Sequence, residues 1–175
     1  GVDFSGTNNQ ESGVDEADFI KTDGYHLYVL NGNRLEILGV PSFGELTQQG
    51  QLTFEGHPRQ MLLKDDKVVI YSTINTYSLP EEHPLREKVG TPLLTDDYSY
   101  WWYPSQVLTK ITVVDIADCD QPTIMRELYL QGNYQTARRV DSSVRMVNYN
   151  MMNIAGLRTW VELSDNYYNL RDNDI

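Results

Sequence analysis

The chain has 175 residues, of which 40 % are hydrophobic, and this is enough for one packed domain or for several units of a repeat fold. Twenty-five acidic against fourteen basic residues give a formal net charge of -11, which repels phosphate backbones, and no basic patch interleaved with aromatic residues counters it. Nucleic acid is therefore excluded as an expected partner, and no transmembrane segment is expected because no apolar run is long enough to cross a bilayer.

Residues 1–12 are expected to be an N-terminal extension. The chain opens on Gly1 without an initiator methionine, which fits a processed mature form or a deliberately trimmed chain. The single Cys119 is compatible with a reducing or an oxidising compartment, and it cannot form an intramolecular disulfide or a metal site by itself.

Residues 13–55 predict a first unit of four antiparallel strands. A short strand within residues 13–22 leads into the tight turn Asp23-Gly24, which favours the positive φ angles of a hairpin. Alternating apolar residues then predict strands over residues 25–30, 34–40 and 46–54.

Residues 56–131 predict a second unit of the same kind. Asp65 lies 42 positions after Asp23 in an equivalent turn, with a strand on either side of it. Residues 75–107 hold four prolines and no alternation, so they are expected to be an inserted loop of 33 residues. The last two strands of the unit are expected over residues 110–116 and 124–130.

A third unit begins at residue 132 and stops after two strands, which are expected within residues 132–150. Its turn contains Asp141, 76 positions after Asp65. When the inserted residues 75–107 are not counted, this spacing is close to the 42 positions between Asp23 and Asp65. Gly56 and Gly132 each lie nine positions before the turn aspartate of their unit, which supports the repeat without reference to the insertion.

A four-stranded unit that recurs roughly every 40–45 residues is typical of a β-propeller blade. The predicted fold class is all-β: a partial β-propeller of about two and a half four-stranded antiparallel blades with long loop insertions. Residues 151–175 are expected to be an insertion or tail, with the apolar spacing of a short helix. Because so few blades cannot close a ring, we favour a fragment of a longer protein over self-association through the open blade faces.

A distinct motif opens the first unit, and it comprises Gly13, Val14, Asp15, Glu16, Ala17, Asp18, Lys21, Asp23 and Gly24. It resembles the opening of the secreted bacterial and archaeal β-propeller domain family, described as distantly related to WD40 repeats. Residues 137–145 resemble a later blade start of that family. The resemblance covers roughly residues 8–150 and only the N-terminal portion of the family's longer domain. The resemblance implies a secreted or cell-surface location, and it implies no particular enzymatic activity.

The acidic residues of the motif allow two interpretations. Asp15, Glu16, Asp18 and Asp23 could be Ca²⁺ ligands or a carboxylate pair for acid–base catalysis. We favour a structural role, in which they accept backbone N–H bonds at turns or pair with Lys21 and with arginines of a neighbouring blade. No catalytic residue, metal or cofactor is assigned, because the chain lacks the usual catalytic and metal-binding motifs.

Aromatic residues gather at the end of the first insertion: Tyr98, Tyr100, Trp101, Trp102 and Tyr103. Such a group can form a stacking platform for a sugar ring or a hot spot for a protein partner. The alternative is that it anchors the loop to a blade face, since burial of each ring contributes roughly 2–3 kcal/mol.

Two functions from different classes follow. The first is an exported β-propeller scaffold that binds protein or glycan through its aromatic insertions, and it is the one we favour. The alternative is a carbohydrate-active enzyme with carboxylates near the propeller axis, which requires two converging carboxyl groups and a raised pKa for one of them.

Overall fold

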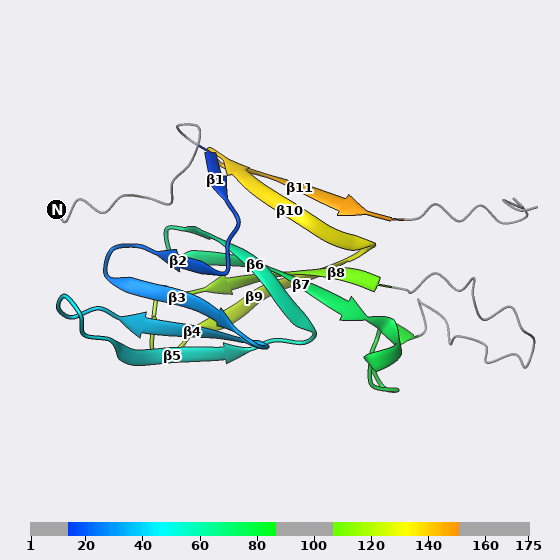
Figure 1. Cartoon of the computed structure of the whole chain (residues 1–175). Coiled ribbons are helices and arrows are strands. Elements are labelled where there is room, and N and C mark those ends of the chain that lie inside the picture. Colours follow the sequence, from blue (N-terminus) through cyan, green and yellow to red (C-terminus); the bar gives the residue numbers. More distant parts are fainter. Residues whose placement is uncertain (1–13, 87–106, 151–175) are drawn as a thin grey trace, which may run out of the picture.

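The computed structural model describes residues 14–86 and 107–150, in which eleven strands form three antiparallel sheets (Figure 1). The first sheet contains β2 (Ile20–Thr22), β3 (His26–Asn31), β4 (Arg34–Gly39) and β5 (Thr47–Thr53). The second contains β6 (His57–Lys64), β7 (Lys67–Asn75), β8 (Val107–Asp115) and β9 (Thr123–Gln131). The third contains β1 (Val14–Glu16), β10 (Asn133–Val140) and β11 (Ser143–Tyr149). A short 3₁₀ helix, η1 (Thr76–Ser78), follows β7.

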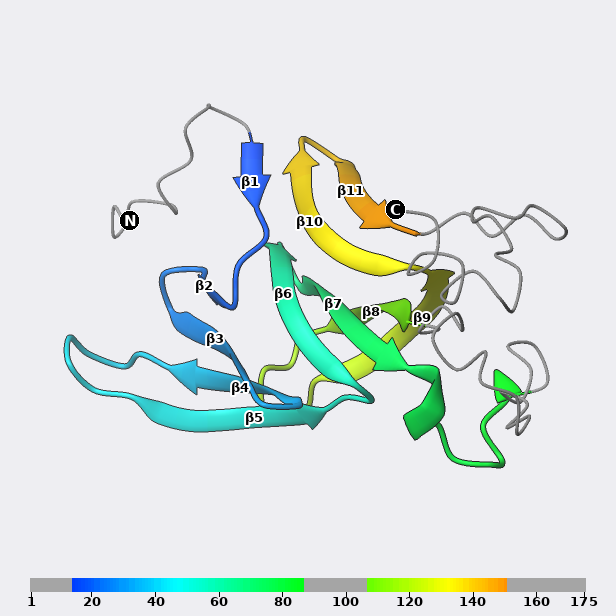
Figure 2. The ribbon, with the colours of Figure 1, turned by 45° about the vertical axis from the view of Figure 1, so that its right-hand side comes forward.

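The three sheets follow one another in space and do not interleave, as two views of the ribbon show (Figures 1 and 2). In the first and second sheets each strand pairs with the next strand along the chain, which is the order of a propeller blade. Strand β6 contacts β2 and β3, and β10 contacts β7 and β8, so the first strand of each later sheet packs against the sheet before it. The predicted all-β, partial-propeller fold is confirmed.

The turns after the first strand of each unit explain the recurrent aspartates. Asp65 and Asp141 have φ angles of 48° and 53°, and Asp adopts this left-handed conformation more readily than most residues. The first unit differs from the expected tight turn, because its turn extends over residues 23–25 with Gly24 at φ 92°. The Asp23 carboxylate accepts the backbone N–H groups of Tyr25 and His26, which stabilises the wider turn.

Two glycines make equivalent contacts where the second and third units begin. Gly56 and Gly132 have φ angles of 76° and 110°, and a Cβ on either would lie 2.6 Å from a carbonyl oxygen of its own sheet, that of Thr73 or Tyr149. Only glycine allows the linker to pass so close to the second strand of the blade. The nine-residue spacing therefore reflects a real structural repeat.

Two apolar layers hold the sheets together. The layer between the first and second sheets includes Tyr28, Leu35 and Ile37 from one side and Met61 and Ile70 from the other. The layer between the second and third sheets is smaller, with Leu62, Tyr71, Ala17 and Ala137 at its centre. Each layer is formed by the alternate residues of strands that share one face.

The segment that contains β1 crosses the first strands of the sheets. β1 pairs with β10, and Ala17 N then donates to Ala137 O (3.1 Å) while Asp18 N donates to Met61 O (3.0 Å). The chain enters the first sheet only at β2 (Figure 2). One short strand was expected within residues 13–22, but the structure has two, because residues 14–16 pair with the distant strand β10 and only β2 joins the first sheet.

Large apolar side chains remain exposed, among them Met125 and Val147 on the sheets and Phe43 and Leu46 in the connection between β4 and β5. Self-association through these faces stays a prediction. Among residues 14–86 and 107–150, no helix has the length and apolar character needed to span a membrane.

Candidate functional site

One end of the sheets collects the features that could bind a ligand. β7 ends and β8 begins at this end, which we call the insertion face. β6 and β10 also begin there, and β11 ends there (right-hand side of Figure 1). A pocket of about 470 Å³ lies between the second and third sheets at the insertion face. Its lining residues are Arg59, Gln60, Thr73, Asn133, Tyr134, Gln135 and Tyr149.

Both first strands that border the pocket are irregular at the same level. β6 has a bulge between Pro58 and Gln60, and β10 has one between Tyr134 and Thr136. A bulge bends its strand and redirects a side chain, and bulges are frequent beside binding sites. Residues at both bulges, Arg59 and Gln60 on β6 and Tyr134 and Gln135 on β10, line the pocket.

Two contacts order the inner wall of the pocket. The Tyr134 ring stacks on Tyr71 with centroids 4.8 Å apart, and its hydroxyl donates to Gln60 Oε1 at 2.7 Å. Burial raises the pKa of Tyr71 to about 12 and also raises the pKa of Tyr134, so both phenols are neutral near pH 7. On the outer wall Arg59 Nε donates to Thr73 Oγ1 at 3.2 Å, which orients the guanidinium group.

A charged cluster fixes the linker between the first and second sheets. Lys110 is 3 % exposed, and its Nζ lies 3.0 Å from Glu55 Oε2 and 2.7 Å from Glu127 Oε1. Tyr129 donates its hydroxyl to Glu55 Oε2 at 2.8 Å, and His83 Nε2 lies 3.0 Å from Glu55 Oε1. Burial opposes ionisation of Glu55, but the hydrogen bonds from Tyr129 and Lys110 outweigh it and hold the Glu55 pKa below its ordinary value.

The same cluster anchors the start of the insertion, because His83 belongs to it. Asn75 caps η1 by accepting the N–H of Tyr77 at 3.0 Å, and Arg86 donates to the carbonyl of Leu79. Leu79 and Leu85 pack against the apolar residues at the ends of β7 and β8. The start of the insertion, residues 76–86, which we call its stem, is therefore folded against the second sheet.

The acidic motif is held by ion pairs. Asp15 lies 2.8 Å from Lys21 Nζ and 3.6 Å from Arg139 Nε, and Glu16 lies 2.8 Å from Arg138 Nη2. The pairing expected with Lys21 and with arginines of a neighbouring blade is present, since both arginines belong to β10. The Asp15 carboxylate therefore connects the third sheet to Lys21 of the first sheet, whereas Glu16 pairs within the third sheet.

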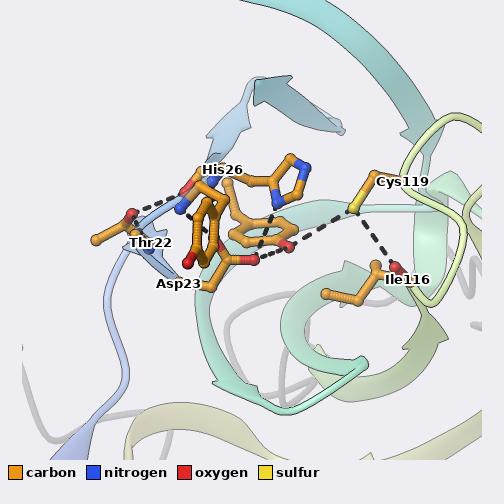
Figure 3. Close-up of polar contacts among 8 residues, drawn as sticks. Thr22, Asp23, His26, Ile116 and Cys119 are labelled. Atoms are coloured by element: carbon orange, nitrogen blue, oxygen red, sulfur yellow. Dashed lines mark hydrogen bonds and ion pairs between the residues drawn. The ribbon is translucent and has the colours of Figure 1, made fainter. Parts of the chain in front are cut away.

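At the opposite end of the sheets, a chain of polar contacts joins the first sheet to the second (Figure 3). The Tyr28 hydroxyl donates to Asp23 Oδ2 at 2.9 Å and lies 3.8 Å from Cys119 Sγ, and His26 Nδ1 lies 3.0 Å from the same Asp23 oxygen. Burial raises the pKa of the Cys119 thiol, which keeps it protonated at neutral pH. This arrangement packs the sheets and does not activate a nucleophile.

The family of the chain is shown by a comparison with protein-family models. Residues 4–172 match the model described as "Beta propeller domain". The chain belongs to this family. No curated protein matched it, and no solved structure did. The secreted location and the distant relation to WD40 repeats stay predictions.

Several residues proposed from the sequence lie outside the part of this propeller that the structure describes. They are Gly13 and the aromatic group Tyr98, Tyr100, Trp101, Trp102 and Tyr103. Their role as a ligand site stays a prediction. Among the described residues, no group of three or more His, Cys, Asp and Glu side chains is arranged to hold a metal ion.

The pocket of the propeller was not anticipated from the sequence. Its residues come from four strands, β6, β7, β10 and β11, and the nearest signals were the excess of Tyr and the glycines at the unit starts. The links between His83 and Glu55 and between Tyr28 and Cys119 were also missed, because each pair is far apart in the chain.

Proposed function

We propose that this propeller is an exported, non-catalytic scaffold that binds protein or glycan through the aromatic segment of its insertion. The observation that carries the proposal is the anchored stem. His83 attaches the start of the insertion to Glu55, and Leu85 packs against the ends of β7 and β8. A fixed stem lowers the entropy cost of holding aromatic side chains at one face of the molecule.

The state of the carboxylates supports a scaffold over the enzyme. Asp15 and Glu16, which lie where the sheets meet, are paired with basic side chains. Asp23, Glu55 and Asp115 have pKa values below the ordinary range, held there by hydrogen bonds, whereas a general acid requires a raised value. The proposed export rests on the resemblance of the opening motif to the secreted family.

The test replaces Trp101 and Trp102 with alanine in the full chain and measures retention on immobilised glycans and on extracted surface proteins. Tyr77, an exposed aromatic residue of the stem, gives the matched control Tyr77→Ala. We expect the double variant to lose about tenfold or more in affinity for one class of ligand, with the control unchanged. Unchanged binding together with lost solubility would show that the segment only anchors the loop.

A further inference from the structure

The pocket at the insertion face has a charge opposite to that of the chain. The chain has 25 acidic residues and a net charge of -11. Among the described residues, however, no carboxylate lines the pocket, whereas the guanidinium group of Arg59 does line it. Local positive charge in an acidic protein selects for an anionic group on the ligand. A guanidinium group suits a carboxylate in particular, because its N–H groups can bind both oxygens.

The remaining lining groups suit hydroxyl groups. Gln60, Asn133 and Gln135 carry amides, each with a donor and an acceptor side. Thr73 adds a hydroxyl, so several groups of both kinds converge on one space. The volume of about 470 Å³ lies in the range of roughly 300–1,000 Å³ that is common for small-molecule sites.

An aromatic ring lies at the rim. Tyr149 ends β11, lines the pocket and is 57 % exposed, so it is accessible to a ligand. Its position is set by the backbone, because Gly132 allows the linker to pass against the carbonyl of Tyr149. An exposed ring beside converging amides is suited to the apolar C–H face of a sugar.

We propose that this pocket binds a sugar ring that bears a carboxylate, such as a uronic-acid unit of a glycan. Arg59 binds the carboxylate, the three amides bind the ring hydroxyls, and Tyr149 stacks on the ring. The proposal rests on the glycan arm of the proposed function, but the site is separate from the aromatic segment of the insertion. The inner wall is preorganised, since Tyr134 is held by both Tyr71 and Gln60.

The test titrates the full chain with glucuronate and galacturonate by isothermal calorimetry and by ligand-observed NMR. Glucose and galactose serve as the neutral counterparts, and acetate tests whether a carboxylate alone is sufficient. We expect saturable binding of at least one uronate, with weaker binding of its neutral counterpart and of acetate. Absence of saturable uronate binding up to about 10 mM would overturn the proposal.

Variants then locate the binding. Arg59→Gln should weaken uronate binding about tenfold or more and abolish the preference over the neutral sugar. Arg126→Gln is the matched control, because Arg126 is an exposed residue of β9 outside the pocket. Gln135→Ala, at an exposed position of the pocket, is a second variant and should weaken both sugars. Equal losses in Arg59→Gln and Arg126→Gln would show non-specific attraction and contradict the site.

The variants distinguish the pocket proposal from the proposal that the aromatic segment of the insertion binds a ligand. The variant with Trp101 and Trp102 replaced by alanine should keep uronate binding in the pocket. If it loses uronate binding while Arg59→Gln retains it, the sugar binds the insertion and the pocket proposal is wrong. If neither surface proteins nor larger glycans depend on the tryptophans but the pocket binds uronate, the insertion proposal is wrong.

Discussion

Replacement of Asp15 tests whether the N-terminal segment holds the sheets together. Lys21 is 5 % exposed, and its Nζ donates to Asp15 Oδ1 and to the carbonyl of Glu16. In Asp15→Asn the Lys21 ammonium stays buried without its counter-ion, and Arg139 loses its partner as well. The variant should therefore behave as a broken buried ion pair and not as a lost surface pair.

The magnitude follows from this burial. Loss of one partner of a buried pair costs about 3–5 kcal/mol, whereas exposed pairs contribute roughly 0–1 kcal/mol. Asp15 is 13 % exposed and Lys21 keeps its bond to the Glu16 carbonyl, which places the expected loss near the lower limit, about 3 kcal/mol. Lys21→Met leaves Asp15 paired with Arg139, so it should cost less.

Urea unfolding followed by far-ultraviolet circular dichroism measures these losses. The double variant Asp15→Asn/Lys21→Met should be more stable than the sum of the single losses predicts, with a coupling of about 2 kcal/mol. Asp120→Asn, which removes an exposed carboxylate, is the control and should have little effect. A loss below about 0.5 kcal/mol in Asp15→Asn would refute the reasoning, since only a surface pair behaves in that way.

Three further predictions concern the contacts between sheets. Gly50→Ala places a Cβ 2.1 Å from the Cys119 carbonyl oxygen and should destabilise the chain by about 2 kcal/mol. The neighbouring Gln51→Ala is the control and should have little effect. Equal melting temperatures for the two variants would contradict this packing. The lowered pKa of Glu55 means that the unfolded chain binds its proton more tightly, so the stabilisation by Glu55 is present above about pH 4.5 and is lost as the pH falls through the folded value. The difference in unfolding free energy between wild type and Glu55→Gln should therefore shrink as the pH falls below about 6. A difference that grows on acidification would contradict this prediction. The raised pKa of Cys119 predicts slower alkylation at pH 8 in the folded chain than in urea, and equal rates would show an exposed thiol.

The repeat could be predicted from the sequence because its signals are local. Turn aspartates, alternating apolar residues and the glycines at the unit starts each act within a few positions, and Asp65, Asp141, Gly56 and Gly132 all have the positive φ angles that such signals indicate. The ion pairs of the motif were also accessible, since Asp15 lies near Lys21 in the chain.

The pairing of β1 could not be predicted in the same way. Val14 pairs with Val140, and no spacing in the sequence indicates a partner so distant. Val14 is the single apolar residue of β1, so this segment suits any strand edge and does not indicate its sheet. The pocket could not be predicted for the same reason. It depends on two bulges and on the distance between two sheets, and neither produces a recognisable pattern in one segment of the sequence.

Hydrogen exchange of individual amides tests the central claim most directly, namely that the N-terminal segment crosses the first strands of the sheets. Ala17 N and Asp18 N donate to Ala137 O and Met61 O, so both amides should exchange about 100-fold or more slowly than in an unstructured peptide. Unprotected amides at Ala17 and Asp18, beside protected ones in β6 and β10, would contradict the arrangement.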